Sequence, residues 1–319
     1  MFITGFPLLC RNPEMNYSIL TEKKQGLLTA FCSYAMWGVL PLYWKALAVV
    51  PSYEIICHRI VWSFLFALIL LVLQKKTAVL FKALSDVRAL ATFAATATML
   101  GSNWLVYIWA VNSGYIVESS LGYFINPLIA VLFGVLFLKE PLRPGQWAAL
   151  FVALLGVLYL TFSYGQFPWI ALTLAITFAC YSLLRKTARL HSLEGLVFET
   201  GLLSIPASIA LVFFAGQGQA HFFACGSRIT LLLIASGLVT ALPLLLFVFG
   251  AQKITMTAIG LLQYLAPTLQ FLIGLLIFKE PFPPERLIGF VIIWTALALY
   301  TGENIYQRFQ LKNRLSGQG

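Results

Sequence analysis

The triplet Lys139-Glu140-Pro141 recurs as Lys279-Glu280-Pro281, which lies 140 residues further along the chain. Further correspondences at this offset include Ser52 and Glu54 with Ser192 and Glu194, Leu121 with Leu261, and Pro144 with Pro284, and Asn126-Pro127 falls on Ala266-Pro267. Agreement of several segments at one offset, without gaps, indicates an internal duplication. The sequence therefore predicts two copies of one structural unit.

The composition excludes a water-soluble protein. Of the 319 residues, 60% are hydrophobic and only 10% are charged, and the mean hydropathy is +0.88. Soluble chains carry about 25% charged residues, so these few charges could not cover the outside of so large a domain. A soluble enzyme is excluded, and the net charge of +10 does not indicate nucleic-acid binding because the charges lie in short gaps between apolar runs.

Ten apolar segments remain when the chain is divided wherever charges, Pro or Gly cluster, and each is close to the roughly 20 residues that a helix needs to cross a bilayer. They are expected at Gln25–Val49, Tyr53–Gln74, Val87–Val111, Val117–Leu138, Gly145–Ser163, Phe167–Ala188, Glu194–Phe214, Arg228–Gly250, Thr257–Phe278 and Arg286–Gly302. We therefore predict an all-α membrane protein with ten transmembrane helices.

Each copy of the repeat holds five segments, and an odd number of crossings turns the second copy upside down relative to the first. The expected division is a tail over residues 1–24, a first five-helix repeat over 25–163, a second over 164–303 and a tail over 304–319. Inverted repeats place a substrate site near the bilayer midplane, and rocking of the halves exposes it to alternate sides. Duplication in a purely structural membrane protein is the alternative reading.

Lys and Arg are unevenly divided between the two ends of the predicted helices. The face with both termini carries 16 of the 21, the opposite face carries 4, and Arg59 lies inside a span. Because cytoplasmic loops are enriched in Lys and Arg, we predict a multi-pass protein of the inner (cell) membrane with both termini cytoplasmic. Met15 is an alternative start, which would make residues 1–14 an upstream extension.

Prolines interrupt two predicted helices at equivalent positions. Pro127 and Pro267 lie near the middle of the fourth and ninth spans, where each removes an amide donor and frees the carbonyl four residues earlier. The freed carbonyls belong to Tyr123 and Gln263, which should face protein or a water-filled cavity. We expect both prolines to act as hinges, although a proline can also kink a helix merely to fit its packing.

Several ionisable residues fall within the predicted spans. By default such groups are functional candidates. Arg59 and its repeat equivalent Glu199 are expected roughly 12 Å apart along the membrane normal, too far to pair, so we predict that they mark the two mouths of a central pathway. A structural role for Arg59, paired with Glu118, is the alternative. Glu54 is expected at the water interface, and His58 is either a proton acceptor or a hydrogen-bonded packing residue.

Polar and aromatic side chains also accumulate near the middle of the spans. The further candidates for substrate binding are Tyr34, Trp37, Asn103, Trp104, Tyr123, Asn126, Tyr181, Gln263 and Tyr264. A cavity of this kind suits amphipathic organic solutes, whose rings stack while a few dipoles fix their orientation. Trp44 is expected instead in the interfacial aromatic belt.

No cofactor or metal is expected. The chain has no phosphate-binding Gly-Lys-Ser/Thr sequence, and its histidines, His58, His191 and His221, are scattered at different depths. Direct coupling to ATP and metal catalysis are therefore disfavoured, and transport would be driven by an ion gradient or by an exchanged solute.

Four local motifs resemble one known family. The stretch Glu118–Pro127 (Glu-Ser-Ser-Leu-Gly-Tyr-Phe-Ile-Asn-Pro), His58-Arg59 followed by Trp62-Ser63, Asn103-Trp104 and the run Ile108–Asn112 resemble the RarD family. This is a branch of the EamA-type transporters in the drug/metabolite transporter superfamily. The resemblance extends from Gln25 to Tyr306.

The resemblance implies a ten-helix inner-membrane permease with two five-helix EamA repeats and cytoplasmic termini. The family name is associated with chloramphenicol sensitivity, but its physiological substrates are poorly defined. One departure from internal symmetry is Ala266, which stands where the first repeat has Asn126, so residue roles do not transfer from one half to the other.

The leading hypothesis is a secondary carrier that moves a small organic metabolite or drug-like solute by alternating access, with export as the expected direction. It is not expected to be an enzyme. The alternatives are a membrane-embedded sensor or scaffold that binds a small ligand without transport, and an intramembrane enzyme acting on lipid-linked substrates. The expected partners are membrane lipid and the small-molecule substrate, but no nucleic acid. The oligomeric state is open, with a homodimer among the alternatives.

Overall fold

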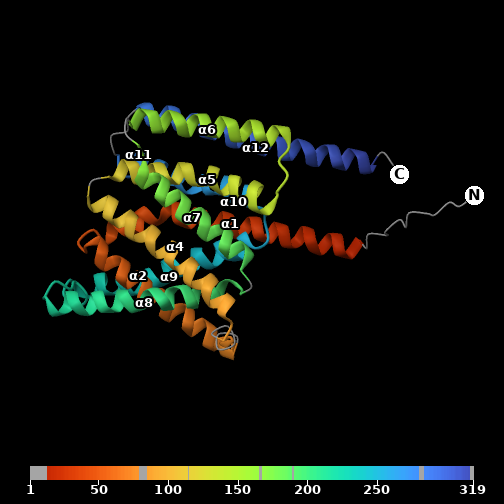
Figure 1. Cartoon of the computed structure of the whole chain (residues 1–319). Coiled ribbons are helices and arrows are strands. Elements are labelled where there is room, and N and C mark those ends of the chain that lie inside the picture. The colour runs from red at the N-terminus through yellow and green to blue at the C-terminus, as the bar shows by residue number, and fades with distance from the viewer. Residues whose placement is uncertain are drawn as a thin grey trace, which may run out of the picture.

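The computed structural model describes the backbone of residues 13–78, 85–113, 115–164, 167–188, 190–279 and 284–316. Within these ranges the regular structure is entirely helical. The helices lie side by side, and the beginning of α1 and the end of α12 are at the same end of the bundle (Figure 1).

The helix bounds follow the predicted spans closely. They are α1 Pro13–Ala46, α2 Ser52–Leu73, α4 Val87–Asn112, α5 Ile116–Leu138, α6 Pro144–Tyr164, α7 Trp169–Thr187, α8 Ser192–Gly216, α9 Gly226–Ala251, α10 Met256–Gln263, α11 Leu265–Leu276 and α12 Pro284–Ser316. In the described part of the chain, nine helices are long and apolar enough to cross a membrane. The short helices α10 and α11 together occupy the remaining predicted span.

The two ends of the chain are more helical than expected. Helix α12 continues to Ser316, through residues that we assigned to a tail, and α1 begins at Pro13. Side-chain contacts one turn apart continue along the polar end of α12, where Gln307 Nε2 donates to Glu303 Oε1 at 3.2 Å and Gln310 Nε2 donates to the Tyr306 hydroxyl at 2.8 Å. An apolar run marks where a helix is in lipid, not where the helix ends.

The duplication is visible in the helices themselves. Helices α2 and α8 both begin at a serine, α6 and α12 both begin at a proline, and each pair of starts is 140 residues apart. The packing follows the same correspondence. The first repeat's helix α5 packs against α7, and the equivalent helices α10 and α11 pack against α1. Likewise α2 packs against α9, and their equivalents α8 and α4 pack against each other. These observations agree with two inverted five-helix repeats.

The repeated Lys-Glu-Pro triplet has a structural explanation. Lys139 ends α5 with φ 53°, and Lys279 has φ 51°; this left-handed conformation terminates a helix. The chain then turns so that the Glu140 carboxylate accepts hydrogen bonds from the Met256 and Thr257 amides at 2.7 and 3.1 Å. A carboxylate at a helix N-terminus satisfies free amides and complements the helix dipole, so Glu140 fixes the beginning of α10.

The two prolines differ in their effect. Helix α5 is continuous through Pro127, so the predicted interruption of the fourth span is wrong. In the second repeat the helix breaks at Tyr264, and Pro267 follows in the first turn of α11. The Thr268 hydroxyl donates to the Tyr264 carbonyl at 2.7 Å, which satisfies a backbone group at the break.

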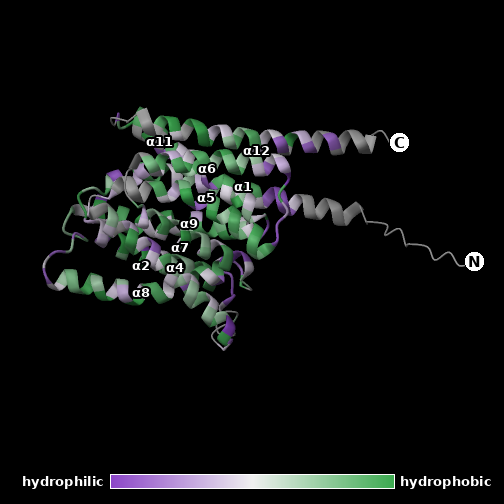
Figure 2. Ribbon diagram, turned by 45° about the horizontal axis from the view of Figure 1, so that its top comes forward, coloured by the Kyte–Doolittle hydropathy of each residue, from purple (hydrophilic) through white to green (hydrophobic). Residues whose placement is uncertain are grey.

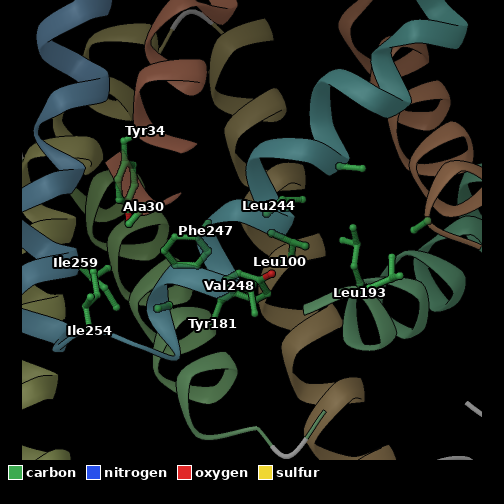
Figure 3. Packing of buried hydrophobic residues seen from close by; sticks show 14 of the residues in the cluster. Ala30, Tyr34, Leu100, Tyr181, Leu193, Leu244, Phe247, Val248, Ile254 and Ile259 are labelled. Carbon is green, nitrogen blue, oxygen red and sulfur yellow. The ribbon is translucent and has the colours of Figure 1, made fainter. Parts of the chain in front are cut away.

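A buried apolar cluster joins α1, α7, α9 and α10. Phe247 lies between Tyr34 and Tyr181 (Figure 3), with ring centroids 5.9 and 6.3 Å away. The outer surfaces of the helices are also largely apolar, whereas hydrophilic residues gather in connections and in the last part of α12 (Figure 2). This distribution suits a bundle surrounded by lipid.

Helices α5 and α10 cross at close range. A Cβ atom at Gly260 would lie 2.6 Å from the Pro127 carbonyl oxygen, so only glycine allows the two backbones to approach this closely. Beside it the Tyr264 hydroxyl donates to the Phe124 carbonyl at 3.2 Å. Phe124 and Tyr264 are themselves 140 residues apart, which places this hydrogen bond on the axis relating the two halves.

We predict that Gly260→Ala destabilises the protein by about 1–3 kcal/mol, because the added methyl group forces the two helices apart. Thermal unfolding of the purified protein in detergent measures this effect. The matched control is Gly302→Ala, since no atom lies within 4 Å of a Cβ built there. Equal melting temperatures for the two variants would contradict the close crossing.

Candidate functional site

A cavity of about 200 Å³ occupies the centre of the bundle, in the half remote from the chain ends. Eight helices contribute to its wall. The lining residues are Tyr34, Trp37, Leu40, Pro41 and Trp44 of α1, Arg59 of α2, Leu100, Asn103, Trp104 and Tyr107 of α4, Gly122, Tyr123 and Asn126 of α5, Leu174 and Phe178 of α7, Thr240 and Leu244 of α9, Gln263 of α10, and Ala266 and Gln270 of α11.

The structure brings most of the predicted site residues to this wall. Those that line the cavity are Tyr34, Trp37, Arg59, Asn103, Trp104, Tyr123, Asn126 and Gln263; those that do not are Glu54, His58, Tyr181, Glu199 and Tyr264. Sequence reasoning missed Tyr107, although it follows Asn103 by one helical turn and so shares its face. It also missed Thr240 and Gln270, which carry no distinguishing signal.

Arg59 is held at the wall by uncharged groups. Its Nε donates to Thr240 Oγ1 at 3.0 Å, and the guanidinium carbon lies 4.7 and 5.2 Å from the ring centroids of Trp44 and Trp104. Trp44 therefore contacts this cation and is not only a residue of the interfacial belt. Each indole attracts the guanidinium by about 0.5–2 kcal/mol but leaves its positive charge in place. The side chain of Glu118, the proposed alternative partner, lies outside the described residues.

Amide side chains supply the polar part of the wall. Asn126 is 8% exposed and Gln263 is 5% exposed. Within the described part of the chain, Asn126 Oδ1 and both polar atoms of the Gln263 side chain have no hydrogen-bond partner. Asn103 differs, because its Nδ2 donates to the Leu174 carbonyl at 2.8 Å and so ties α4 to α7. Leaving a buried amide unpaired is costly, and both of these side chains line the cavity.

Aromatic rings complete the cavity. Trp37 packs edge-on against Tyr34 and Phe178, at centroid distances of 5.4 and 6.0 Å. On the opposite wall Tyr107 and Tyr123 meet edge-on at 6.2 Å. An apolar cavity of about 150 Å³ can hold benzene, so this space can take a small solute that carries a ring.

We expected Glu54 at the water interface; it lies in the first turn of α2, and its side chain is completely buried within the protein. Its carboxylate accepts hydrogen bonds from the backbone and ring nitrogens of His221, at 2.8 and 2.7 Å, which anchor the α8–α9 connection to α2. His58 Nε2 lies 3.8 Å from the same carboxylate, and its ring stacks on Phe222 at 4.8 Å. Both residues have these other partners, and neither lines the cavity.

Glu199 and Tyr181 do not line the cavity and lie on its side towards the chain ends. Glu199 Oε1 is 3.3 Å from Arg185 Nε, both side chains are fully buried, and the Tyr181 hydroxyl donates to Glu199 Oε2 at 3.3 Å. The Arg185 guanidinium also lies against Gly195, where a Cβ atom would be 2.0 Å from Nη1. From the sequence we had assigned Arg185 to the charges on the face with both termini, so this ion pair was not predicted.

Tyr264 lies on the far side of the α5–α10 crossing from the cavity. It is buried by its contact with Phe124 and lines a smaller space of about 10 Å³ between α5, α6, α10 and α12. Among the described residues, no group of three or more His, Cys, Asp or Glu lies close enough together to hold a metal ion.

Comparison with known proteins decides the family. The model of the EamA-like transporter family matches residues 24–162. The protein RarD of Streptomyces exfoliatus is 42% identical over 92% of this chain and 93% of its own length. The chain belongs to the RarD family of EamA-type transporters. YojE of Bacillus subtilis, named an uncharacterized transporter, is 42% identical over 88% of this chain and 94% of its own length.

The fold agrees with this assignment. A solved crystal structure with 17% sequence identity superposes with a TM-score of 0.66, covering 87% of this chain and 96% of that chain. The predicted fold class, an all-α membrane protein of EamA type, is confirmed. As a family member the chain is a membrane transporter, and its family is not one of enzymes.

We predict that Glu199→Gln lowers the stability of the protein by about 3–5 kcal/mol, because it leaves the buried Arg185 charge without a carboxylate. Thermal unfolding in detergent measures this loss. Adding Arg185→Gln should restore part of it, since the unpaired charge is then removed.

The control for this experiment is Lys76→Gln. Lys76 Nζ lies 3.7 Å from Glu194, but the lysine side chain is 47% exposed, and exposed ion pairs contribute little. A Glu199→Gln variant that unfolds at the same temperature as Lys76→Gln would show that the buried pair carries no stability.

Proposed function

We propose that this protein is a secondary carrier that exports small organic metabolites or drug-like solutes through the inner membrane by alternating access. The observation that carries the proposal is the central cavity, where Asn126 and Gln263, one from each repeat, present polar atoms that have no hydrogen-bond partner among the described residues. A concave site with mostly apolar walls and a few convergent polar groups is typical of small-molecule binding.

Closure of the bundle on one side supports alternating access. Towards the chain ends, Tyr181, Phe247 and Met256 are fully buried beneath the cavity, and the Arg185–Glu199 pair lies among them. Glu199 occupies in the second repeat the place of Arg59 in the first. We propose that Arg59 guards the open entrance and that Glu199 guards the entrance that is closed in this state.

The break between α10 and α11 supports a hinge at Pro267. The broken helix passes directly beside the cavity, with Gln263 on one side of the break and Ala266 on the other. Pro127 occupies the equivalent place in a continuous helix, and we propose that α5 bends there only when the other entrance opens.

The excess of Lys and Arg on the face with both termini supports a cytoplasmic position for the termini, so the cavity would face outward.

We predict that Asn126→Ala lowers saturable solute flux at least tenfold without reducing membrane insertion. The measurement is counterflow in proteoliposomes with a panel of labelled aromatic and aliphatic solutes, neutral and charged, including chloramphenicol. Sided reconstitution with an outward or inward solute gradient also measures direction. The control is Gln217→Ala, which removes an exposed amide outside the cavity.

Two outcomes would contradict the carrier. Tight binding of a solute with no flux in any direction would instead identify a sensor or scaffold. Chemical conversion of a membrane-extract compound, in place of its movement, would identify an enzyme. Unaltered flux in Asn126→Ala would remove this residue from the site.

A further inference from the structure

We infer that the solute carried by this protein is a small organic anion, a carboxylate on an apolar or aromatic body, whose charged group binds Arg59. This inference rests on the proposed carrier function and names its substrate class. The cavity, the contacts of Arg59 and the free amide groups are the observations that carry it.

The first step is the charge balance of the cavity. Among the described residues that line the cavity, Arg59 is the one cation, and none is a carboxylate. The ion pairs found among the described residues involve Glu54, Glu194 and Glu199, none of which reaches Arg59. The described lining of the cavity therefore carries one positive charge, that of Arg59.

The second step is the direction in which Arg59 offers its hydrogen bonds. Nε is used by Thr240 Oγ1 at 3.0 Å, which fixes the plane of the guanidinium. Trp44 and Trp104 contact the guanidinium through their rings and accept no hydrogen bond in its plane. Among the described residues no hydrogen bond from the two terminal nitrogens is found, and their fork geometry matches the two oxygens of a carboxylate.

Arg59 contrasts with Arg185, an arginine in the last turn of α7. Arg185 has a carboxylate at 3.3 Å and is fully buried, as a structural charge in lipid must be. Arg59 has the same chemistry and lies at the wall of a cavity with no such partner among the described residues. A solute carboxylate would take the place that Glu199 takes beside Arg185.

The rest of the wall fixes the other end of the solute. Aromatic rings line the cavity together with Arg59, and Asn126 Oδ1 on the same wall has no hydrogen-bond partner among the described residues. A ring or branched alkyl body with an acid at one end and a hydrogen-bond donor near the other would satisfy each of these groups.

Matched pairs of acids and their neutral amides test the inference. Six aryl and branched-alkyl acids, beginning with 3-phenylpropionate, are each compared with the corresponding amide by calorimetric titration of the purified full chain at pH 7.4. We expect at least one acid to bind ten times more tightly than its amide. A panel in which no acid exceeds its amide, including one with no binding at all, overturns the inference.

Two variants locate the preference. Arg59→Gln should reduce the acid-to-amide ratio to within twofold of unity. The matched control is Lys45→Gln, which removes one positive charge from an exposed residue outside the cavity wall and should keep the ratio. If Arg59→Gln folds and retains the acid-to-amide ratio, another residue recognises the carboxylate and the inference fails. If Arg59→Gln does not fold, the acid-to-amide ratio of the unaltered protein still tests the inference.

This test is separate from that of the carrier. Suppose that a neutral solute shows saturable flux, that Asn126→Ala lowers this flux, and that no acid binds more tightly than its amide. These results would support the carrier function and reject the anionic substrate.

Discussion

The crossing of α5 and α10 is the contact on which the arrangement of the site depends. Gly260 allows the Pro127 carbonyl to approach, and Tyr264 bonds to Phe124, its own equivalent in the other repeat. Residues of these helices on one side of the crossing line the central cavity, and residues on the other side line the small space near α6 and α12. The crossing thus separates these two interior spaces.

Polar groups in the membrane interior fall into two classes, which differ in whether the protein itself satisfies them. Glu54 is buried and pairs with the partly exposed His221, and Arg185 and Glu199 are both buried and pair with each other. Removing one member of such a pair costs about 3–5 kcal/mol, so these groups hold the bundle together. Arg59, Asn126 and Gln263 lie at the cavity wall with unused hydrogen-bonding capacity among the described residues, and this contrast is the basis for separating function from architecture.

Much of the fold could be predicted from the sequence because lipid imposes strict rules. Span length follows from the thickness of the bilayer, and the repeat follows from one offset, so most helix bounds were predicted to within a few residues. The helical end of α12 was not, since helix formation in water depends on local contacts and not on an apolar run. The continuity of α5 through Pro127 was also missed, because a proline marks a weak point in a helix without fixing its geometry.

The site was predicted less completely. Depth and residue type identified Arg59, Asn126 and Gln263, which the structure brings to one cavity. The same reasoning could not distinguish Glu54 from these residues, because its partner His221 lies in a distant connection and contacts it only in the folded chain. Which side of a helix faces a cavity, and which faces another helix, is decided by packing that the spacing of residues along the chain does not reveal.

The most direct test of alternating access uses one pair of equivalent positions. Trp44 lines the cavity, and Leu184, 140 residues later, lies in α7 next to Arg185 of the buried ion pair. Trp44→Cys and Leu184→Cys would be made separately in a variant whose five native cysteines are replaced by alanine, and labelled with a membrane-impermeant maleimide from either side during transport. The account predicts that Trp44→Cys reacts from the side opposite the termini and Leu184→Cys from the side of the termini. Reaction of both from one side, or an unreactive Leu184→Cys during undiminished flux, would contradict it.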